Sequence, residues 1–201
     1  MLTNLNFKID INELREYYNT VVTEFDHLMW SWSRYGNIVK QWSDAAYSNP
    51  DNLKTYGWAI QSNLKNENKV CPPWNISSDE LGEYKNTSLA FGIILRLQKV
   101  IPYAYRWAIS VQPPGGTVST HTDHESEYTV WIPIYTSGPA ITFINQGIIK
   151  DYQLESNGNV YLLDTTVSHY TRNDSDKDRV AIIFRLNRSN IDHLLKIVGN
   201  I

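Results

Sequence analysis

The second half of the chain constrains the fold most, because it reads as a succession of short β-strands. Seven segments there are rich in Val, Ile, Thr, Tyr and Trp: 103–112, 117–123, 128–135, 140–145, 151–156, 159–164 and 179–186. Turn-forming sequences such as PPGG, TSGP, NQG and SNGN separate them. Short strands joined by turns favour a sandwich, jelly roll or barrel over a parallel α/β sheet.

The flanking sequence predicts helices packed on the outside of this β-structure. Apolar residues recur at helical spacing after Asp10, which is a suitable N-cap with Glu13 three positions later. The expected helices span 11–28, 87–99 and 188–201, with Pro102 closing the second. We also expect strands at 2–8 and 56–63, and a helical turn at 79–84.

With 201 residues the chain is long enough for one domain with a sizeable core and short for two. We therefore expect a single domain over 1–201, mainly β with flanking helices. Within it, 1–100 would be a mixed, partly helical part that packs on a jelly-roll core at 101–187, and 188–201 a closing helix.

Composition excludes several classes of function. The net charge of −3 and pI near 5.9 do not suggest the basic face that nucleic acid requires. No apolar run approaches the ~20 residues of a membrane span, and the N-terminus lacks the pattern of a signal peptide. The single cysteine, Cys71, indicates a reducing compartment. We expect a soluble, cytoplasmic protein without a nucleic-acid or membrane partner; the oligomeric state is not readable.

His121 and Asp123 are the first candidates for chemistry. Residues i and i+2 of a strand point to one face, so these two side chains can hold one ion together, while His124 points the other way. The spacing alone is weak evidence, because a His-x-Asp pair also arises by chance at the end of a surface strand.

Two residues further along strengthen the case. His169 follows an apolar strand, and two imidazoles with one carboxylate form the facial triad of non-haem Fe(II) oxygenases. Arg179 begins the last strand and shares a face with Ala181, Ile183 and Arg185. An inward-facing arginine needs an anion, and its guanidinium fits a carboxylate well.

These residues together resemble the iron- and 2-oxoglutarate-dependent dioxygenases, in particular the aspartyl/asparaginyl β-hydroxylase branch. The resemblance spans about residues 102–187. It includes a Pro-Gly turn before His121, an apolar strand with Asp before His169, then Asn, an acidic turn and Arg179. It is weak or absent over 1–85.

The resemblance implies a double-stranded β-helix, a cupin-like jelly roll. It implies Fe(II) held by His121, Asp123 and His169, with 2-oxoglutarate and O₂ as co-reactants. Arg179 would bind the distal carboxylate of 2-oxoglutarate, and Ser110, eleven residues before the first ligand, would assist it. The activity implied is hydroxylation, with release of succinate and CO₂.

Two departures from that branch bear on the substrate. The β-hydroxylase that gives the branch its name has Gly at the position of Asp123, and Arg at that of Val130. The chain therefore resembles the three-ligand members, which include hydroxylases of free amino acids. The substrate stays open between a small molecule, such as an amino acid, and an aspartyl, asparaginyl or prolyl-type side chain of a peptide.

Strand parity suggests residues that line the substrate pocket. Arg106 shares parity with Ala108 and Ser110, and Tyr128 shares parity with Val130. We therefore expect Arg106, Tyr128 and Val130 in the pocket, and Trp131 on the opposite face. The alternative function is a cupin that binds metal without catalysis or without 2-oxoglutarate; such a protein has no need of an inward-facing Arg179.

Overall fold

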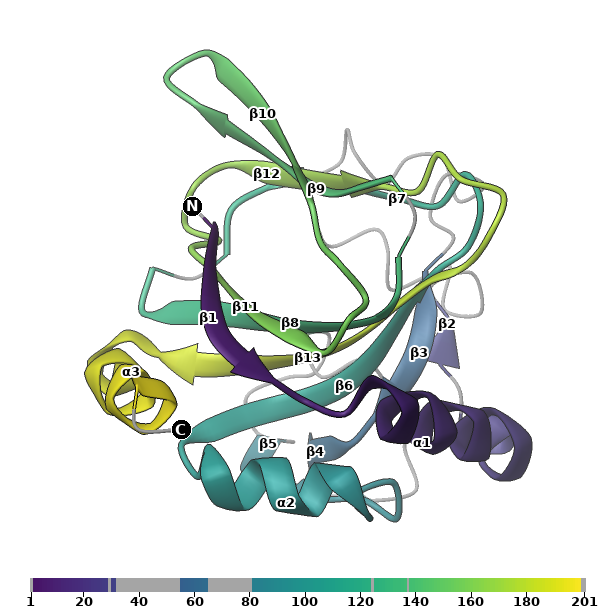
Figure 1. Ribbon diagram of the computed structural model, residues 1–201. Helices are drawn as coiled ribbons and strands as arrows, with labels where there is room; N and C mark the ends of the chain where they lie inside the picture. The colour runs from purple at the N-terminus through teal and green to yellow at the C-terminus, as the bar shows by residue number, and fades with distance from the viewer. Residues whose placement is uncertain are drawn as a thin grey trace.

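The computed structural model describes residues 2–28, 30–31, 55–64, 81–123, 125–136 and 138–199. Two antiparallel sheets dominate these residues and face each other (Figure 1). The larger sheet has the strand order β1-β11-β8-β13-β6-β3-β2, and the smaller sheet has the order β10-β9-β12-β7. A separate two-stranded sheet pairs β4 with β5.

Eight consecutive strands form the double-stranded β-helix that the resemblance implied. Their bounds are β6 (Ala104–Gln112), β7 (Thr117–His121), β8 (Glu127–Tyr135), β9 (Pro139–Asn145), β10 (Ile148–Gln153), β11 (Asn159–Leu163), β12 (His169–Arg172) and β13 (Arg179–Asn187). The chain passes from one sheet to the other along this series, and the first strand of the series pairs with the last. This pattern is a jelly roll, so the fold class expected from the sequence is confirmed.

Strands from the N-terminal half extend the larger sheet at both edges. β1 (Leu2–Lys8) pairs with β11, while β3 (Tyr56–Ala59) pairs with β6 and with the short β2 (Trp30–Ser31). The remaining strands, β4 (Gln61–Leu64) and β5 (Leu81–Asn86), form the small separate sheet. The mixed N-terminal part is therefore continuous with the jelly roll through backbone hydrogen bonds.

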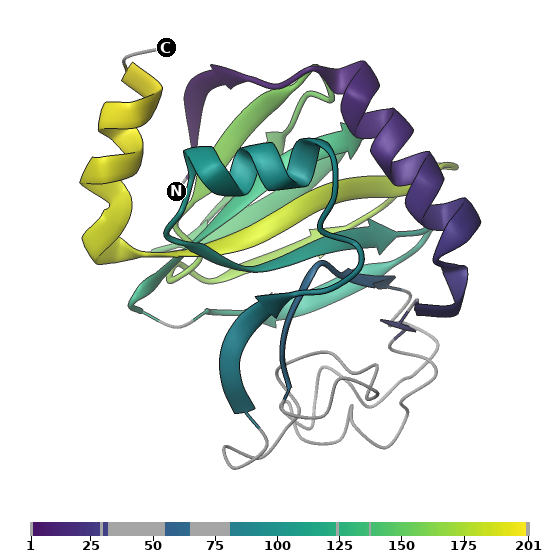
Figure 2. The same ribbon diagram turned by 90° about the horizontal axis from the view of Figure 1, so that it is seen from below.

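The helices lie outside the barrel. α1 (Ile11–Glu24) and α2 (Ile93–Val100) cover the outer face of the larger sheet, and α3 (Ile191–Gly199) lies beside its edge (Figure 2). A large apolar cluster fills the space between sheet and helices, with Leu14, Ile94, Trp107, Val130 and Phe184 among its buried members. This cluster, rather than the barrel interior, is the main hydrophobic core.

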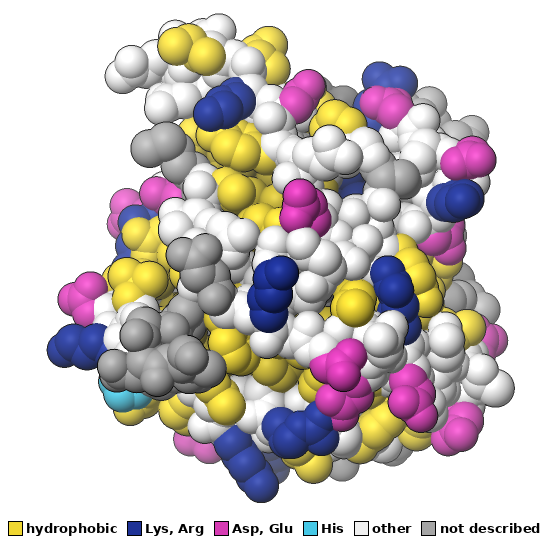
Figure 3. Space-filling view, viewed as in Figure 1, with side chains coloured by type: hydrophobic (Ala, Val, Ile, Leu, Met, Phe, Trp, Pro, Cys, Tyr) yellow, Lys and Arg dark blue, Asp and Glu magenta, His cyan; other side chains and the backbone are white. Residues whose placement is uncertain are grey.

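A second, smaller apolar cluster lies between the two sheets. Its buried members are Ala140, Ile141, Phe143, Leu154, Tyr161 and Leu163. The β9–β10 hairpin continues beyond the barrel and carries hydrophobic side chains at its end (Figure 3), where Ile148 and Ile149 are 70% and 65% exposed.

Most of the expected elements are present at nearly the expected bounds. The first helix ends at Glu24 and is followed by a short 3-10 turn at Asp26–Leu28, and the second begins at Ile93 instead of 87. The Asp10 side chain caps α1 by accepting from the backbone N–H groups of Asn12 and Glu13. A 3-10 turn at Arg188–Asn190 leads into the closing helix α3.

Two local predictions were wrong. A helical turn was expected at 79–84, but within the described part of that range the chain forms strand β5 (81–86), because pairing with β4 outweighs local propensity. Strand β12 was missed, since four residues with alternating burial give too little pattern to recognise. Among the helices that the structure describes, none is long and apolar enough to cross a membrane.

Candidate active site

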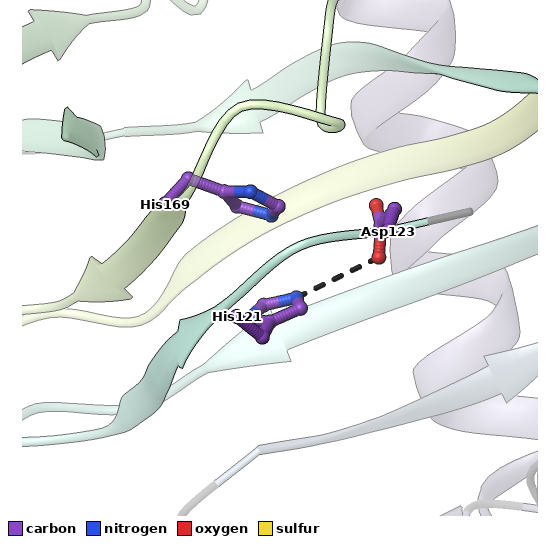
Figure 4. Close-up of side chains that lie close together, drawn as sticks. All are labelled: His121, Asp123 and His169. Carbon is purple, nitrogen blue, oxygen red and sulfur yellow. Dashed lines mark ion pairs between the residues drawn. The ribbon is translucent and has the colours of Figure 1, made fainter. Parts of the chain in front are cut away.

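The two predicted ligand segments meet at one end of the smaller sheet. His121 ends β7, and His169 begins β12 directly opposite it in the strand register. Asp123 lies two residues beyond β7, and its backbone N–H donates to the carbonyl of Thr165 at 2.8 Å. The three side chains converge (Figure 4), and their potential ligand atoms lie within 4.8 Å of one another. The structure thus brings together all three predicted metal ligands.

The protonation of His169 suits a metal ligand. Its Nδ1 lies 2.9 Å from the carbonyl oxygen of Val167, and because a carbonyl only accepts, Nδ1 carries the proton. Nε2 is therefore left with its lone pair on the side of His121 and Asp123. Burial, reinforced by the neighbouring His121, lowers the pKa of His169 to about 4, so the imidazole is neutral near pH 7.

The Asp123 carboxylate has two different sides. Oδ1 lies 3.7 Å from Nε2 of His121, whereas Oδ2 accepts from Arg185 Nη1 at 2.5 Å and from Thr129 Oγ1 at 3.3 Å. Burial by itself raises the pKa of this carboxyl group, but the Arg185 cation and the hydrogen bonds lower it to about 2. Asp123 is thus an anion with one oxygen directed at the imidazoles and the other held by the protein.

The donor set fits a divalent transition metal. Two neutral imidazoles and one ionised carboxylate on one side of an ion leave other coordination positions for exogenous ligands. The hydrogen bonds of His169 Nδ1 and Asp123 Oδ2 are the outer contacts that usually orient metal ligands. Fe(II) is the metal that this donor set typically holds in oxygenases.

Arg179 crosses the interior of the barrel. It begins β13 in the larger sheet, yet its Nη1 donates to the backbone carbonyls of Pro139 and Arg172 in the smaller sheet, at 2.6 and 3.2 Å. Its Nη2 contacts the side-chain oxygen of Gln112. The side chain is 3% exposed, and no carboxylate of the described residues forms an ion pair with it. Burial lowers the pKa of Arg179 to about 10.

Ser110 lies on the same inner face of the sheet. It is opposite Ala181 and two residues before Gln112, whose side chain contacts Arg179. Asn173, by contrast, is structural: its side chain donates to the carbonyls of Gln112 and Lys177 at 2.6 and 2.8 Å and so ties the β12–β13 turn to β6. The role of Ser110 toward a cosubstrate stays a prediction.

The pocket assignment of Tyr128 and Val130 was wrong. Val130 is 0% exposed within the core cluster under the helices, and Tyr128 packs against the same cluster. Trp131 instead packs on the cluster between the sheets, and Thr129 contacts Asp123. Both faces of β8 are covered, one by helices and one by the smaller sheet, so its hydrophobic pattern did not reveal which face is inward.

Arg106 is also displaced from the position that parity predicted. The register between β13 and β6 shifts by one residue, from Ile183 opposite Ala108 to Arg185 opposite Tyr105. Arg106 has a φ of 56° at this bulge, and its Nε donates to the Tyr84 hydroxyl at 2.9 Å. Tyr105 takes the inner position in its place, because residues paired across strands share a face.

Arg185, Thr129 and Thr165 are site residues that the sequence reasoning missed. The two threonine hydroxyls lie 3.0 Å apart, and Arg185 Nη1 contacts Thr129 beside Asp123. A signal for Arg185 was present, since it shares strand parity with Arg179. No local sequence pattern indicated the two threonines: Thr129 lies near the start of β8, and Thr165 lies just after the end of β11.

The chain combines a double-stranded β-helix with a His/Asp/His cluster at the end of the smaller sheet. This combination is characteristic of the non-haem metal oxygenases built on this fold. The aspartyl/asparaginyl β-hydroxylase family model matches residues 16–189. The chain therefore belongs to that family of hydroxylases. No protein among curated sequences matches significantly.

Solved structures share part of the fold. An oxidoreductase of the 2OG-Fe(II) oxygenase family from Burkholderia pseudomallei is 14% identical, with a TM-score of 0.48 over 67% of this chain and 71% of its own. A cupin domain from Bordetella pertussis is 28% identical, with a TM-score of 0.32 over 39% of this chain and 77% of its own. At such TM-scores the assignment of the fold rests on the strand order itself.

Proposed function

We propose that this chain is an Fe(II)- and 2-oxoglutarate-dependent hydroxylase of an amino acid, or of an aspartyl, asparaginyl or prolyl-type side chain. His121, Asp123 and His169 would hold Fe(II), and Arg179 would bind the distal carboxylate of 2-oxoglutarate. One atom of O₂ would enter succinate and the other the new hydroxyl group, with CO₂ released from the cosubstrate. Bound Fe(II) would supply the redox chemistry that this reaction requires.

The observation that carries the proposal is the pairing of the ligand cluster with a buried cation in the same barrel. Arg179 contacts the backbone of Arg172, which lies three residues from His169 along β12, or roughly 10 Å at ~3.3 Å per residue. A buried guanidinium without an ion-pair partner among the described residues favours an anionic ligand. A dicarboxylate with one end at the metal and the other at Arg179 meets that need.

The residues have distinct tasks in this scheme. Neutral His169 and anionic Asp123 keep their ligand atoms available near pH 7, since the pKa of each is well below that value. Arg179 orients the cosubstrate through two hydrogen bonds to its carboxylate, the geometry for which guanidinium is best suited. Phe143, whose ring centroid lies 5.7 Å from that of His169, helps to keep water away from the metal side.

The test is anaerobic addition of Fe(II) and then 2-oxoglutarate to the protein. We expect a weak visible absorption band from the metal–cosubstrate complex, and its loss in Asp123→Ala and His169→Ala. Succinate should form when O₂ is admitted with substrate. Absence of both the band and succinate from the wild-type protein would exclude this function and leave a metal-binding cupin that does not use 2-oxoglutarate.

Arg179→Met separates cosubstrate binding from metal binding. We expect the KM for 2-oxoglutarate to rise at least about tenfold, because a buried charged hydrogen bond is lost, while Fe(II) affinity stays within about twofold. Arg96→Met, at an exposed arginine on α2 that pairs with Glu13, is the control. Equal loss of metal and cosubstrate binding in Arg179→Met would make this residue structural.

A further inference from the structure

The inner face of the larger sheet carries a second arginine, Arg185, whose hydrogen-bonding capacity is only partly used. Its hydrogen bonds to Asp123, Thr129 and Thr165 all involve one nitrogen atom, Nη1. Within the part of the chain that the structure describes, Nε and Nη2 make no hydrogen bond. The side chain is 18% exposed, so solvent reaches part of it. Arg185 is therefore a cation beside the metal ligands with donors to spare.

An acidic side chain accompanies Arg185 on the same face. Glu127 begins β8 and is paired with Asn187, two residues from the pair of Thr129 with Arg185. Two residues along a strand correspond to roughly 7 Å. Tyr105, directly opposite Arg185 on β6, donates from its hydroxyl group to Oε1 of Glu127 at 2.6 Å. Among the described residues, none forms a hydrogen bond or ion pair with Oε2 of Glu127.

Arg185 and Glu127 are thus a cation and an anion that flank Tyr105 next to the ligand cluster without pairing with each other. Among the described residues, each keeps one hydrogen-bonding edge without a partner, and each side chain is long enough to move by a few ångströms. The two edges match the carboxylate and the ammonium group that a free α-amino acid carries on one carbon atom. A residue inside a peptide has neither charge, so it would leave Glu127 without a counter-ion and Arg185 with Asp123 alone.

We infer that the substrate is a free α-amino acid, with its carboxylate bound by Arg185 and its ammonium group by Glu127. This inference rests on the proposed hydroxylase function and resolves the alternative that the sequence left open. Arg185 serves as a specificity residue, since its Nη1 holds Asp123 while Nε and Nη2 face the substrate. The substrate's α-carbon is thereby fixed beside the metal ligands, and its side chain can extend toward the metal.

The experiment compares two pools on the Fe(II)- and 2-oxoglutarate-loaded protein: the twenty free L-amino acids, and the same residues as N-acetyl amides. Two readouts are needed, the shift of the anaerobic absorption band and the succinate formed in air. We expect the free pool to shift the band and to stimulate succinate formation, and the blocked pool to do neither. Deconvolution of the active pool then identifies the amino acid.

Variants test whether Glu127 and Arg185 recognise the amino acid. Glu127→Gln keeps the contact with Tyr105, touches no metal ligand and should raise the half-saturating concentration of the free amino acid at least about tenfold. Arg185→Met should do the same when it is measured at saturating Fe(II), which offsets the weaker metal binding expected from loss of the contact with Asp123. Arg188→Met is the matched control, because Arg188 also pairs with an aspartate, Asp164, but stacks on Tyr128 away from the inner face. It should leave saturation by the amino acid unchanged.

The outcomes are distinguishable. Equal or better stimulation by the blocked pool would overturn the inference and leave the hydroxylase function intact, with a peptide residue as substrate. Unchanged saturation in both Glu127→Gln and Arg185→Met would also overturn it, because recognition would then lie elsewhere. Absence of the absorption band from the wild-type protein would refute the proposed function and this inference with it.

Discussion

At the scale of single residues, a few hydrogen bonds orient each proposed metal ligand. Asp123 presents one oxygen to the imidazoles and the other to Arg185 and Thr129, and His169 is fixed by one backbone carbonyl. Such outer contacts hold ligands in place before the metal arrives, so part of the ordering entropy is lost during folding instead of binding.

Thr129→Val tests this orientation of Asp123. Valine has nearly the same shape but cannot donate to Oδ2, so we expect metal affinity to fall about tenfold, in the range seen for outer-contact residues. A Co(II) titration followed by its visible spectrum measures this directly. The control is Thr142→Val, which removes a buried threonine hydroxyl bound to Asp151 at 2.6 Å. Unchanged Co(II) affinity in Thr129→Val would mean that Arg185 alone positions Asp123.

At the scale of elements, close backbone approaches and polar anchors fix how strands and helices join. Gly158, in the turn before β11, accepts from the backbone N–H of Ile9 at 2.9 Å and has a φ of 87°. A Cβ atom at this position would lie 2.0 Å from the Ile9 carbonyl oxygen. This contact joins the end of β1 to the jelly roll.

Gly158→Ala should destabilise the protein by about 3 kcal/mol, because it adds a backbone clash to the strain of a positive φ. Gly147→Ala is the matched control: its φ is 80°, and no atom lies within 4 Å of the added Cβ. We expect about 1 kcal/mol there. Urea denaturation followed by tryptophan fluorescence gives both values, and similar losses for the two variants would show that the clash is relieved by movement of β1.

Tyr56 links β3 to the turn before β13, and its ionisation makes the stability of the protein pH-dependent in the alkaline range. Its hydroxyl donates to Asp178 at 2.7 Å, and burial together with this carboxylate raises its pKa. Above the ordinary tyrosine pKa of about 10, the unfolded chain releases a proton that the folded chain keeps, so stability falls as pH rises beyond that value. Below pH 10 this contribution is fully present.

Tyr56→Phe should therefore cost about 1 kcal/mol at pH 7, from the lost hydrogen bond, and show a shallower decline of stability above pH 10 than the wild type. Thermal denaturation at pH 7 to 11 measures both effects. Tyr103→Phe, at a tyrosine that is 47% exposed, should reproduce the wild-type curve. A parallel decline in wild type and Tyr56→Phe would contradict the assignment.

At the scale of the whole molecule, the larger sheet separates two apolar clusters with different duties. The cluster under the helices holds residues such as Ile132 and supplies most of the burial, whereas the cluster between the sheets reaches the ligands through Phe143. A substitution in the cluster under the helices should therefore lower stability with little effect on the geometry of the metal ligands.

Ile132→Val and Phe143→Leu test that separation. Each should lower the free energy of unfolding by about 1 to 2 kcal/mol, since each removes a small buried volume. Only Phe143→Leu should weaken Co(II) binding, because only Phe143 packs against a ligand ring. Comparable weakening in Ile132→Val would show that the two clusters respond as one.

The sequence by itself determined what depends on neighbours along the chain. Asp10 capped α1 as expected, turn residues separated the strands, and the i, i+2 spacing placed His121 and Asp123 on one side. The order of His121, Asp123, His169 and Arg179 along the chain carried the resemblance to the family, which the family model supports over 16–189.

Only the tertiary structure decided which faces meet. The inward face of β8 was ambiguous because large apolar residues lie on both faces, and the bulge at Arg106 exchanged that residue for Tyr105. Arg185 is part of the site because it contacts Asp123, which is 62 positions away in the sequence. Such contacts arise from strand register and sheet pairing, which are set by packing over the whole molecule, and no local pattern of residue types encodes them.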